Sequence, residues 1–198
     1  MANVYRPSGL SPVKSIVGDA FSGQGSIYQI AAANASGYAI GDPVISSGTG
    51  SAAGVSGVVL GAATGALRGV IVGLGTDPTT LLNPLNLNSI VRPAAAQATD
   101  WFALVMDDPN TIFTVYEKNT GTPLAAVDIG MNANLVVGTN NGYISGWYLD
   151  NAATATTSTV QVRLLGLSQV SGNAFGNGAQ WLVKINNHEL SAGTAGVA

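Results

Sequence analysis

The chain has 198 residues, of which 46% are hydrophobic and only 9% are charged, so it can bury a core and is excluded from the disordered class. Its net charge of −3 and its 7 dispersed lysines and arginines exclude the basic patch of a nucleic-acid-binding protein. The absence of cysteine excludes a disulfide framework and a thiolate metal site.

Residues 1–13 predict an extended N-terminal arm, because they contain two prolines and no regular hydrophobic pattern. They also lack an apolar segment of signal-peptide length, so we expect synthesis inside the cell.

Residues 14–76 predict a glycine-rich β lobe. Within it, glycine recurs every four residues over the apolar run 55–74, which is the spacing of a membrane helix that pairs through small residues. Arg68 would lie inside such a span, and each glycine weakens a helix by about 1 kcal/mol. We therefore expect two strands, Val58–Ala63 and Leu67–Gly73, joined by a turn at Thr64-Gly65, and no membrane partner.

Three proline dipeptides, Asp77-Pro78, Asn83-Pro84 and Arg92-Pro93, interrupt every regular pattern over residues 77–98. Proline cannot donate to a sheet ladder, so this stretch predicts a proline-rich connection. A second lobe, a β-sandwich or barrel, is expected over residues 99–190 and a flexible small-residue tail over 191–198.

The remaining sequence alternates short β-branched or aromatic runs with Gly, Pro, Asn and Asp, which predicts an all-β fold. A β-sandwich or barrel fits this pattern, a jelly roll is compatible with it, and two β lobes are expected. Turns are predicted at Asp108-Pro109-Asn110 and Asn141-Gly142, and the three tryptophans are expected to anchor one core. The other expected strands are Ile27–Ala31, Pro43–Ser46, Trp101–Met106, Thr111–Glu117, Ala125–Ile129, Leu135–Val137, Tyr143–Leu149, Thr156–Leu165 and Trp181–Ile185.

The sequence contains only weak matches to the motifs of catalytic, metal-binding or cofactor-binding sites. The only histidine, His188, stands beside Glu189 near the tail, where a triad or metal site is hard to build. The stretch from Gly142 to Gly146 does not have the spacing of a nucleophile elbow. Gly48-x-Gly50-x-x-Ala53 lacks the following helix and the acidic residue of a dinucleotide fingerprint, so we expect a loop and no cofactor.

Carboxylates give two further hypotheses. Asp107 and Asp108, with Asn110, are oxygen ligands in one loop and are compatible with a calcium ion, although the same residues favour a turn by themselves. Asp107 and Asp128 would be the carboxylates of a hydrolase, but no pairing or spacing supports that activity. The sequence therefore predicts a protein that is not an enzyme.

Several short sequence segments, which follow one another in a fixed order over most of the chain, resemble structural proteins of tailed-bacteriophage heads. These are the capsid decoration or cement proteins. The segments are Arg6–Val13, Ile40–Val44, Ser89–Pro93, Leu104–Pro109, Asn132–Val137, Gly146–Asp150 and Trp181–His188. The resemblance implies a β-rich dimer or trimer, made in the cytoplasm of the host bacterium. It further implies a place on the outer surface of the virion capsid, where the protein would stabilise contacts between subunits of the major capsid protein.

The arm is the expected surface for the capsid or for a second copy, because Tyr and Arg are enriched at interfaces and proline keeps an arm extended. The alternative is that Tyr5 packs on its own domain. The candidate interface residues are Val4, Tyr5, Arg6, Pro7, Leu10 and Pro12.

A second functional class also fits the composition. A β module of a phage tail or fibre that binds a receptor or glycan would be poor in charge as well, and Trp147-Tyr148 would be its stacking platform. The alternative for these two aromatic residues is packing in the core.

Overall fold

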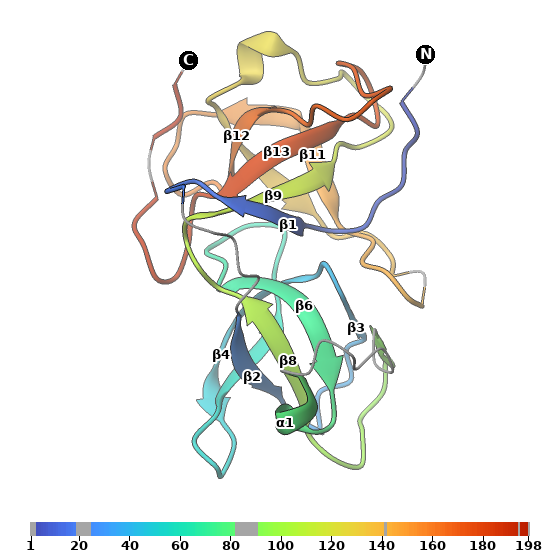
Figure 1. Cartoon of the computed structure of the whole chain (residues 1–198), viewed down its shortest axis with the longest axis vertical. Helices are drawn as coiled ribbons and strands as arrows, with labels where there is room; N and C mark the ends of the chain where they lie inside the picture. Colours follow the sequence, from blue (N-terminus) through green and yellow to red (C-terminus); the bar gives the residue numbers. More distant parts are fainter. Residues whose placement is uncertain (1–2, 19–24, 82–90, 141, 194, 198) are drawn as a thin grey trace.

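The computed structural model describes residues 3–18, 25–81, 91–140, 142–193 and 195–197. Strands account for 44% and helices for 3%, which confirms the all-β prediction. Figure 1 shows two lobes stacked along the long axis of the molecule, with both chain ends at the C-terminal lobe. Among the described residues, no helix is long and apolar enough to cross a membrane.

The N-terminal lobe is a closed five-stranded barrel with the order β2-β5-β4-β6-β8. Its neighbouring strands are antiparallel except β2 and β5, which are parallel and meet at Gln29 and Gly57. The short strands β3 (Tyr38–Ala39) and β7 (Val91–Arg92) pair with each other, and the helix α1 (Pro78–Leu81) follows β6. The barrel strands are β2 (Ser26–Ile30), β4 (Pro43–Gly50), β5 (Ser56–Leu60), β6 (Gly69–Gly75) and β8 (Trp101–Met106).

The C-terminal lobe is a six-stranded sheet with the order β1-β9-β13-β12-β10-β11. A parallel bridge between Glu117 and Leu149 joins the end of β9 to β11, so five of these strands also surround a core and β1 lies at the edge. The 3-10 helix η1 (Ala126–Asp128) lies between β9 and β10. The strands are β1 (Ser11–Ser15), β9 (Thr111–Tyr116), β10 (Asn132–Val136), β11 (Tyr148–Ala155), β12 (Val162–Leu167) and β13 (Gln180–Ile185).

The two barrels repeat one topology. In each, the first strand is parallel to the third, the third pairs with the second, the second with the fourth, the fourth with the fifth, and the fifth with the first. A bulge falls at the same place in both, between Ile71 and Gly73 of β6 and between Leu164 and Gly166 of β12. The register of the second and fourth strands also matches: Pro43 pairs with Val70 and Val44 with Gly69, as Asn132 pairs with Arg163 and Ala133 with Val162.

A left-handed glycine precedes the second strand of both barrels. Gly41 has φ +94° and Gly130 has φ +91°, and each follows an isoleucine. The Gly41 N–H donates to the carbonyl of Ile71 at 2.8 Å, and the Gly130 N–H donates to the carbonyl of Leu164 at 2.8 Å. The fourth strand donates back in both barrels, from Ile71 to the carbonyl of Asp42 and from Leu164 to the carbonyl of Met131.

The barrels form one body because the chain returns from β13 to the N-terminal barrel. Leu67 donates its N–H to the carbonyl of Asn187 and accepts from the N–H of Glu189, both at 2.9 Å. One apolar cluster spans the junction: Leu10, Leu67 and Met106 pack in the same core as Trp147. The N-terminal barrel has a second core around Ile30, Tyr38, Val44, Ile71 and Val105.

The boundary between the lobes differs from the sequence expectation. Trp101–Met106 is the strand β8 of the N-terminal barrel, so the stretch 77–98 connects two strands within that barrel. The prolines mark a long loop between paired strands and not a domain boundary. The chain crosses between barrels at the turn Asp108-Pro109-Asn110, where Thr111 donates its N–H to the carbonyl of Asp108.

Some local predictions were wrong. Ala125–Ile129 contains η1 and no strand, and β11 begins only at Tyr148. Trp101 packs on the core of the N-terminal barrel, apart from Trp147 and Trp181. The strand β1 begins within the expected arm and extends two residues beyond it, and the predicted turn at Asn141-Gly142 lies partly outside the described residues.

The repeated glycines give a matched pair of variants. A Cβ at Gly41 would collide with the carbonyl oxygen of Ser8, whereas a Cβ at Gly130 would come no closer than 3.6 Å to Val197. Gly130→Ala should therefore cost only the left-handed strain, about 1–2 kcal/mol, and Gly41→Ala about 3 kcal/mol or more. Urea unfolding of both variants measures this difference, and equal losses would contradict it.

Candidate functional site

The N-terminal arm lies on the C-terminal barrel of its own chain. The Asn3 side chain donates to the carbonyl of Ala174 at 2.9 Å and accepts from the N–H of the same residue at 3.1 Å. Tyr5 packs edge-on against Tyr116, with ring centroids 6.5 Å apart. Gly9 then donates its N–H to the carbonyl of Trp147 at 3.2 Å. The arm is thus attached to the barrel at several points along its length.

The six candidate interface residues differ in exposure. Val4, with 64% of its surface exposed, and Arg6 are open to solvent, while Tyr5, Pro7 and Pro12 are half-buried. Leu10 is 1% exposed and belongs to the junction core, which removes its side chain from the surface that a partner could touch.

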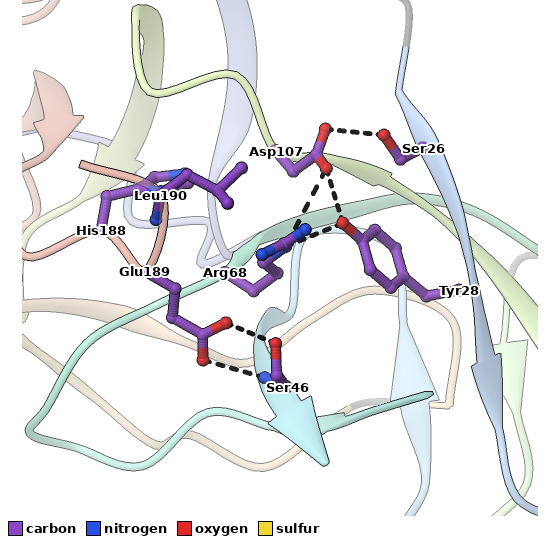
Figure 2. A network of polar contacts seen from close by, with 8 residues as sticks. All are labelled: Ser26, Tyr28, Ser46, Arg68, Asp107, His188, Glu189 and Leu190. Atoms are coloured by element: carbon purple, nitrogen blue, oxygen red, sulfur yellow. Dashed lines mark hydrogen bonds and ion pairs between the residues drawn. The ribbon is translucent and has the colours of Figure 1, made fainter. Parts of the chain in front are cut away.

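A polar network fills the junction between the barrels (Figure 2). The Tyr28 hydroxyl donates to the Asp107 carboxylate at 2.6 Å and accepts from Nε of Arg68 at 2.7 Å. Ser26 donates to the other oxygen of Asp107 at 3.1 Å, and Arg68 lies 4.0 Å from that carboxylate. Burial, followed by the hydrogen bond to Asp107, raises the pKa of Tyr28. These residues come from β2 and from the ends of β6 and β8.

The segment after β13 makes a second group of polar contacts beside the first (Figure 2). Glu189 accepts from the N–H of Ser46 at 2.9 Å and from its hydroxyl at 2.5 Å. His188 is buried, and its Nδ1 accepts from the N–H of Leu190 at 3.0 Å, which places the proton of the neutral ring on Nε2. Burial lowers the pKa of His188. The network therefore fixes the returning segment on β4 and β6.

The side chains of His188 and Glu189 hold backbone segments in place and do not activate a nucleophile. A triad needs a base within hydrogen-bond reach of a hydroxyl. His188 instead receives a backbone N–H, and Ser26 and Ser46 donate to carboxylates. Over the described ranges, no group of three or more His, Asp or Glu side chains could hold a metal ion. Asp108 accepts from the N–H of Asn110 at 2.9 Å, as in an ordinary turn.

Two buried carboxylates lie elsewhere in the barrels. Asp42 accepts from the N–H of Ala39 at 2.8 Å, and burial raises its pKa to about 6. Glu117 accepts from the N–H of Leu124 and from the indole of Trp181, both at 2.9 Å, and its pKa is also raised by burial. Since both carboxylates are 3% exposed or less, they contribute to the internal structure of the barrels.

The outer face of the C-terminal barrel carries apolar side chains that the sequence did not point to. Ile129 and Phe175 are 42% and 48% exposed, and Phe175 leans on the ring of Trp181 at 5.7 Å. Together with Leu165, Leu167 and Leu182, they line a hollow of about 490 Å³. We call this the apolar hollow. None of the described residues that line it is charged.

A second hollow of about 340 Å³ adjoins the first, since Asn173 lines both. Val4, Tyr116 and Val170 contribute its apolar part, and the part of its lining that the structure describes contains no charged residue either. Val4 thus links the candidate arm residues to the apolar hollow. Trp147, in contrast, is 2% exposed within the core and cannot offer its ring as a stacking platform.

One feature of the sequence indicated the apolar hollow. Trp181-Leu182-Val183 and Leu164-Leu165 are consecutive apolar residues in strands. Because neighbouring side chains of a strand point to opposite faces, one of them must face outward from a barrel.

Comparison with known proteins adds no identity: no family model, curated protein or solved structure matches the chain. The fold and the surface therefore define it as an all-β protein of two repeated barrels.

Removing the Tyr28 hydroxyl tests the junction network. Tyr28→Phe leaves the Asp107 carboxylate and Arg68 without their shared partner and should lower the free energy of unfolding by about 1–3 kcal/mol. Tyr116→Phe is the matched control, because its ring packs on Tyr5 outside the network. Urea unfolding at pH 7 checks both, and equal stability of the two variants would refute a stabilising role for the Tyr28 hydroxyl.

The raised pKa of Asp42 predicts a pH dependence of stability. Because its folded-state pKa, about 6, lies above the unfolded value of 3.8, protonation favours the folded state. Its contribution is complete below pH 3.8 and is lost as the pH rises through 6, a change of roughly 3 kcal/mol. Asp42→Asn should reduce the dependence between pH 4 and 6.5 in urea titrations, and an unchanged slope would contradict this assignment.

Proposed function

We propose that the chain is a bacteriophage capsid decoration protein, which binds the outer shell and stabilises contacts between major capsid subunits. The sequence resemblance suggests this class. The observation that supports it best is the pair of adjoining hollows on the outer face of the C-terminal barrel, whose described lining residues carry no charge. Large apolar patches on a water-soluble domain are typical of surfaces that contact a partner.

The absence of charge at this face suits docking. A partner that covers uncharged groups need not remove ions from water, which is the costly part of burying a polar surface. Weak contacts of this kind suffice when many copies act together on one shell.

The attachment of the N-terminal arm to the C-terminal barrel also suits a protein that holds capsid subunits together. A protein that stabilises a shell must resist deformation, and here the arm, both barrels and the returning segment are joined by backbone hydrogen bonds. Val4 and Arg6 lie exposed on this fixed arm and belong to the proposed contact surface. In this proposal the protein acts as a homo-oligomer, a dimer or a trimer, on the virion surface.

Counting copies in purified virus particles tests the proposal. We expect hundreds of copies per particle, in a simple ratio to the major capsid protein, by quantitative mass spectrometry of disrupted particles. A few copies would favour a tail or fibre module that binds a receptor or glycan. Complete absence from particles would refute a structural role.

A further inference from the structure

His188 is the only histidine of the chain and lies at the junction between the two barrels. Its backbone forms a parallel bridge with Leu67, and its carbonyl accepts from the N–H of Ser191 at 3.1 Å. The two hydrogen bonds that join Leu67 to the returning segment are made by its neighbours, Asn187 and Glu189. The imidazole is therefore held where the returning segment meets the N-terminal barrel (Figure 2).

The surroundings of the imidazole suit its neutral form. The side chain is only 3% exposed. Nδ1 accepts from the backbone N–H of Leu190 at 3.0 Å, so this nitrogen presents a lone pair and carries no proton. Nε2 is enclosed, and within the described residues it has no hydrogen-bond partner. A second proton on the ring would point at the Leu190 N–H and would bring a buried charge without a direct acceptor.

The charged groups around His188 come from three segments. Arg68 lies just before β6, Asp107 and Asp108 follow β8, and Glu189 is the next residue of the chain. The three carboxylates favour a charged ring and Arg68 opposes it, but each carboxylate accepts its printed hydrogen bonds from other groups. Burial has the largest effect and lowers the pKa of His188.

Opening of the junction would uncover side chains that its closed form buries. Val70 and Met106 belong to strands of the N-terminal barrel, yet they pack in the same cluster as Trp147. The N-terminal barrel also has its own core around Ile71 and Val105, and each barrel has its own ladder of paired strands. Separation at the junction therefore leaves the strand pairing of both barrels in place.

We propose that His188 makes the junction acid-sensitive, so that protonation of its ring detaches the segment 187–191 from the N-terminal barrel. The added proton removes the acceptor of the Leu190 N–H, and the charged ring is stable only where water reaches it. This inference does not depend on the proposed function.

The direction of the pH dependence follows from the lowered pKa of His188. The open junction binds more protons than the closed one in mild acid, because its imidazole regains an ordinary pKa of 6.5. The contribution of His188 to closure is therefore complete above pH 6.5 and is lost as the pH falls through the lowered pKa. Tyr28 stays uncharged over this range, because its pKa is raised from 10.0.

Single thiols measure this opening, because the chain contains no cysteine of its own. Val70→Cys places a thiol in the junction core, and Val44→Cys is the matched control in the core of the N-terminal barrel, since both valines are 0% exposed. The rate of labelling by a pyridyl disulfide is divided by the rate of the urea-unfolded variant at the same pH. The ratio for Val70→Cys should rise about tenfold between pH 6.5 and pH 5, while that for Val44→Cys stays constant.

A second variant separates the imidazole from other titrating groups. In His188→Asn, the amide oxygen can accept from the Leu190 N–H and does not titrate. The Val70→Cys thiol should then stay protected at pH 5. Asp42, whose pKa is raised to about 6, and the carboxylates near His188 are present in both backgrounds, so the difference between them belongs to His188. Urea unfolding at pH 7 verifies that each variant is folded.

NMR titration of the single imidazole provides a measurement on the chain without substitutions. The ring should become protonated below pH 6.5, over the range in which the Val70→Cys thiol becomes reactive. Equal rises for Val70→Cys and Val44→Cys would show unfolding of the whole chain and overturn the proposal. An undiminished rise in the His188→Asn background would assign the opening to carboxylates. An imidazole that becomes charged while the thiol stays protected would equally overturn it.

Discussion

The return of the chain from β13 to the N-terminal barrel is the constraint on which the rest of the structure depends. Two backbone hydrogen bonds between Leu67 and the segment 187–189 place Glu189 on Ser46 and bury His188 beside Arg68. The same junction encloses Leu10, so the N-terminal arm must run along the C-terminal barrel before β1 begins. Tyr28 is buried, and a buried hydroxyl is costly unless it is paired, which explains why Tyr28 both donates and accepts there.

The two barrels share their topology although few equivalent positions hold the same residues. The shared dipeptides are Ile40-Gly41 with Ile129-Gly130, Gly73-Leu74 with Gly166-Leu167, and Leu104-Val105 with Leu182-Val183. The first pair provides a positive φ, the second follows the bulge, and the third alternates between core and surface. Elsewhere, any side chain of suitable polarity fits. The additions differ: α1 and the β3–β7 pair belong to the first barrel, and β1 to the second.

The sequence was informative about strands and uninformative about their pairing. Short runs of β-branched and aromatic residues between turn residues identified Trp101–Met106 and Trp181–Ile185 as strands, and each strand has a buried face. It could not reveal that β5 and β6, close in sequence, both flank β4 without pairing with each other. The junction network was equally hidden, since Tyr28, Arg68 and Asp107 are separated by about forty residues each and meet only through barrel closure. β1 was missed because its proline suggested an arm, although proline is compatible with an edge strand.

Several of the few charged side chains lie inside the fold and not on its surface. Arg92 is buried beneath Tyr38 and donates to the carbonyls of Ser36 and Asn34 at 2.6 Å, and Arg68 is bound to the junction. Asp42 and Glu117 are likewise buried and accept hydrogen bonds inside the barrels. Part of the small charge content is therefore paired inside the fold, because a buried charge without a partner is costly.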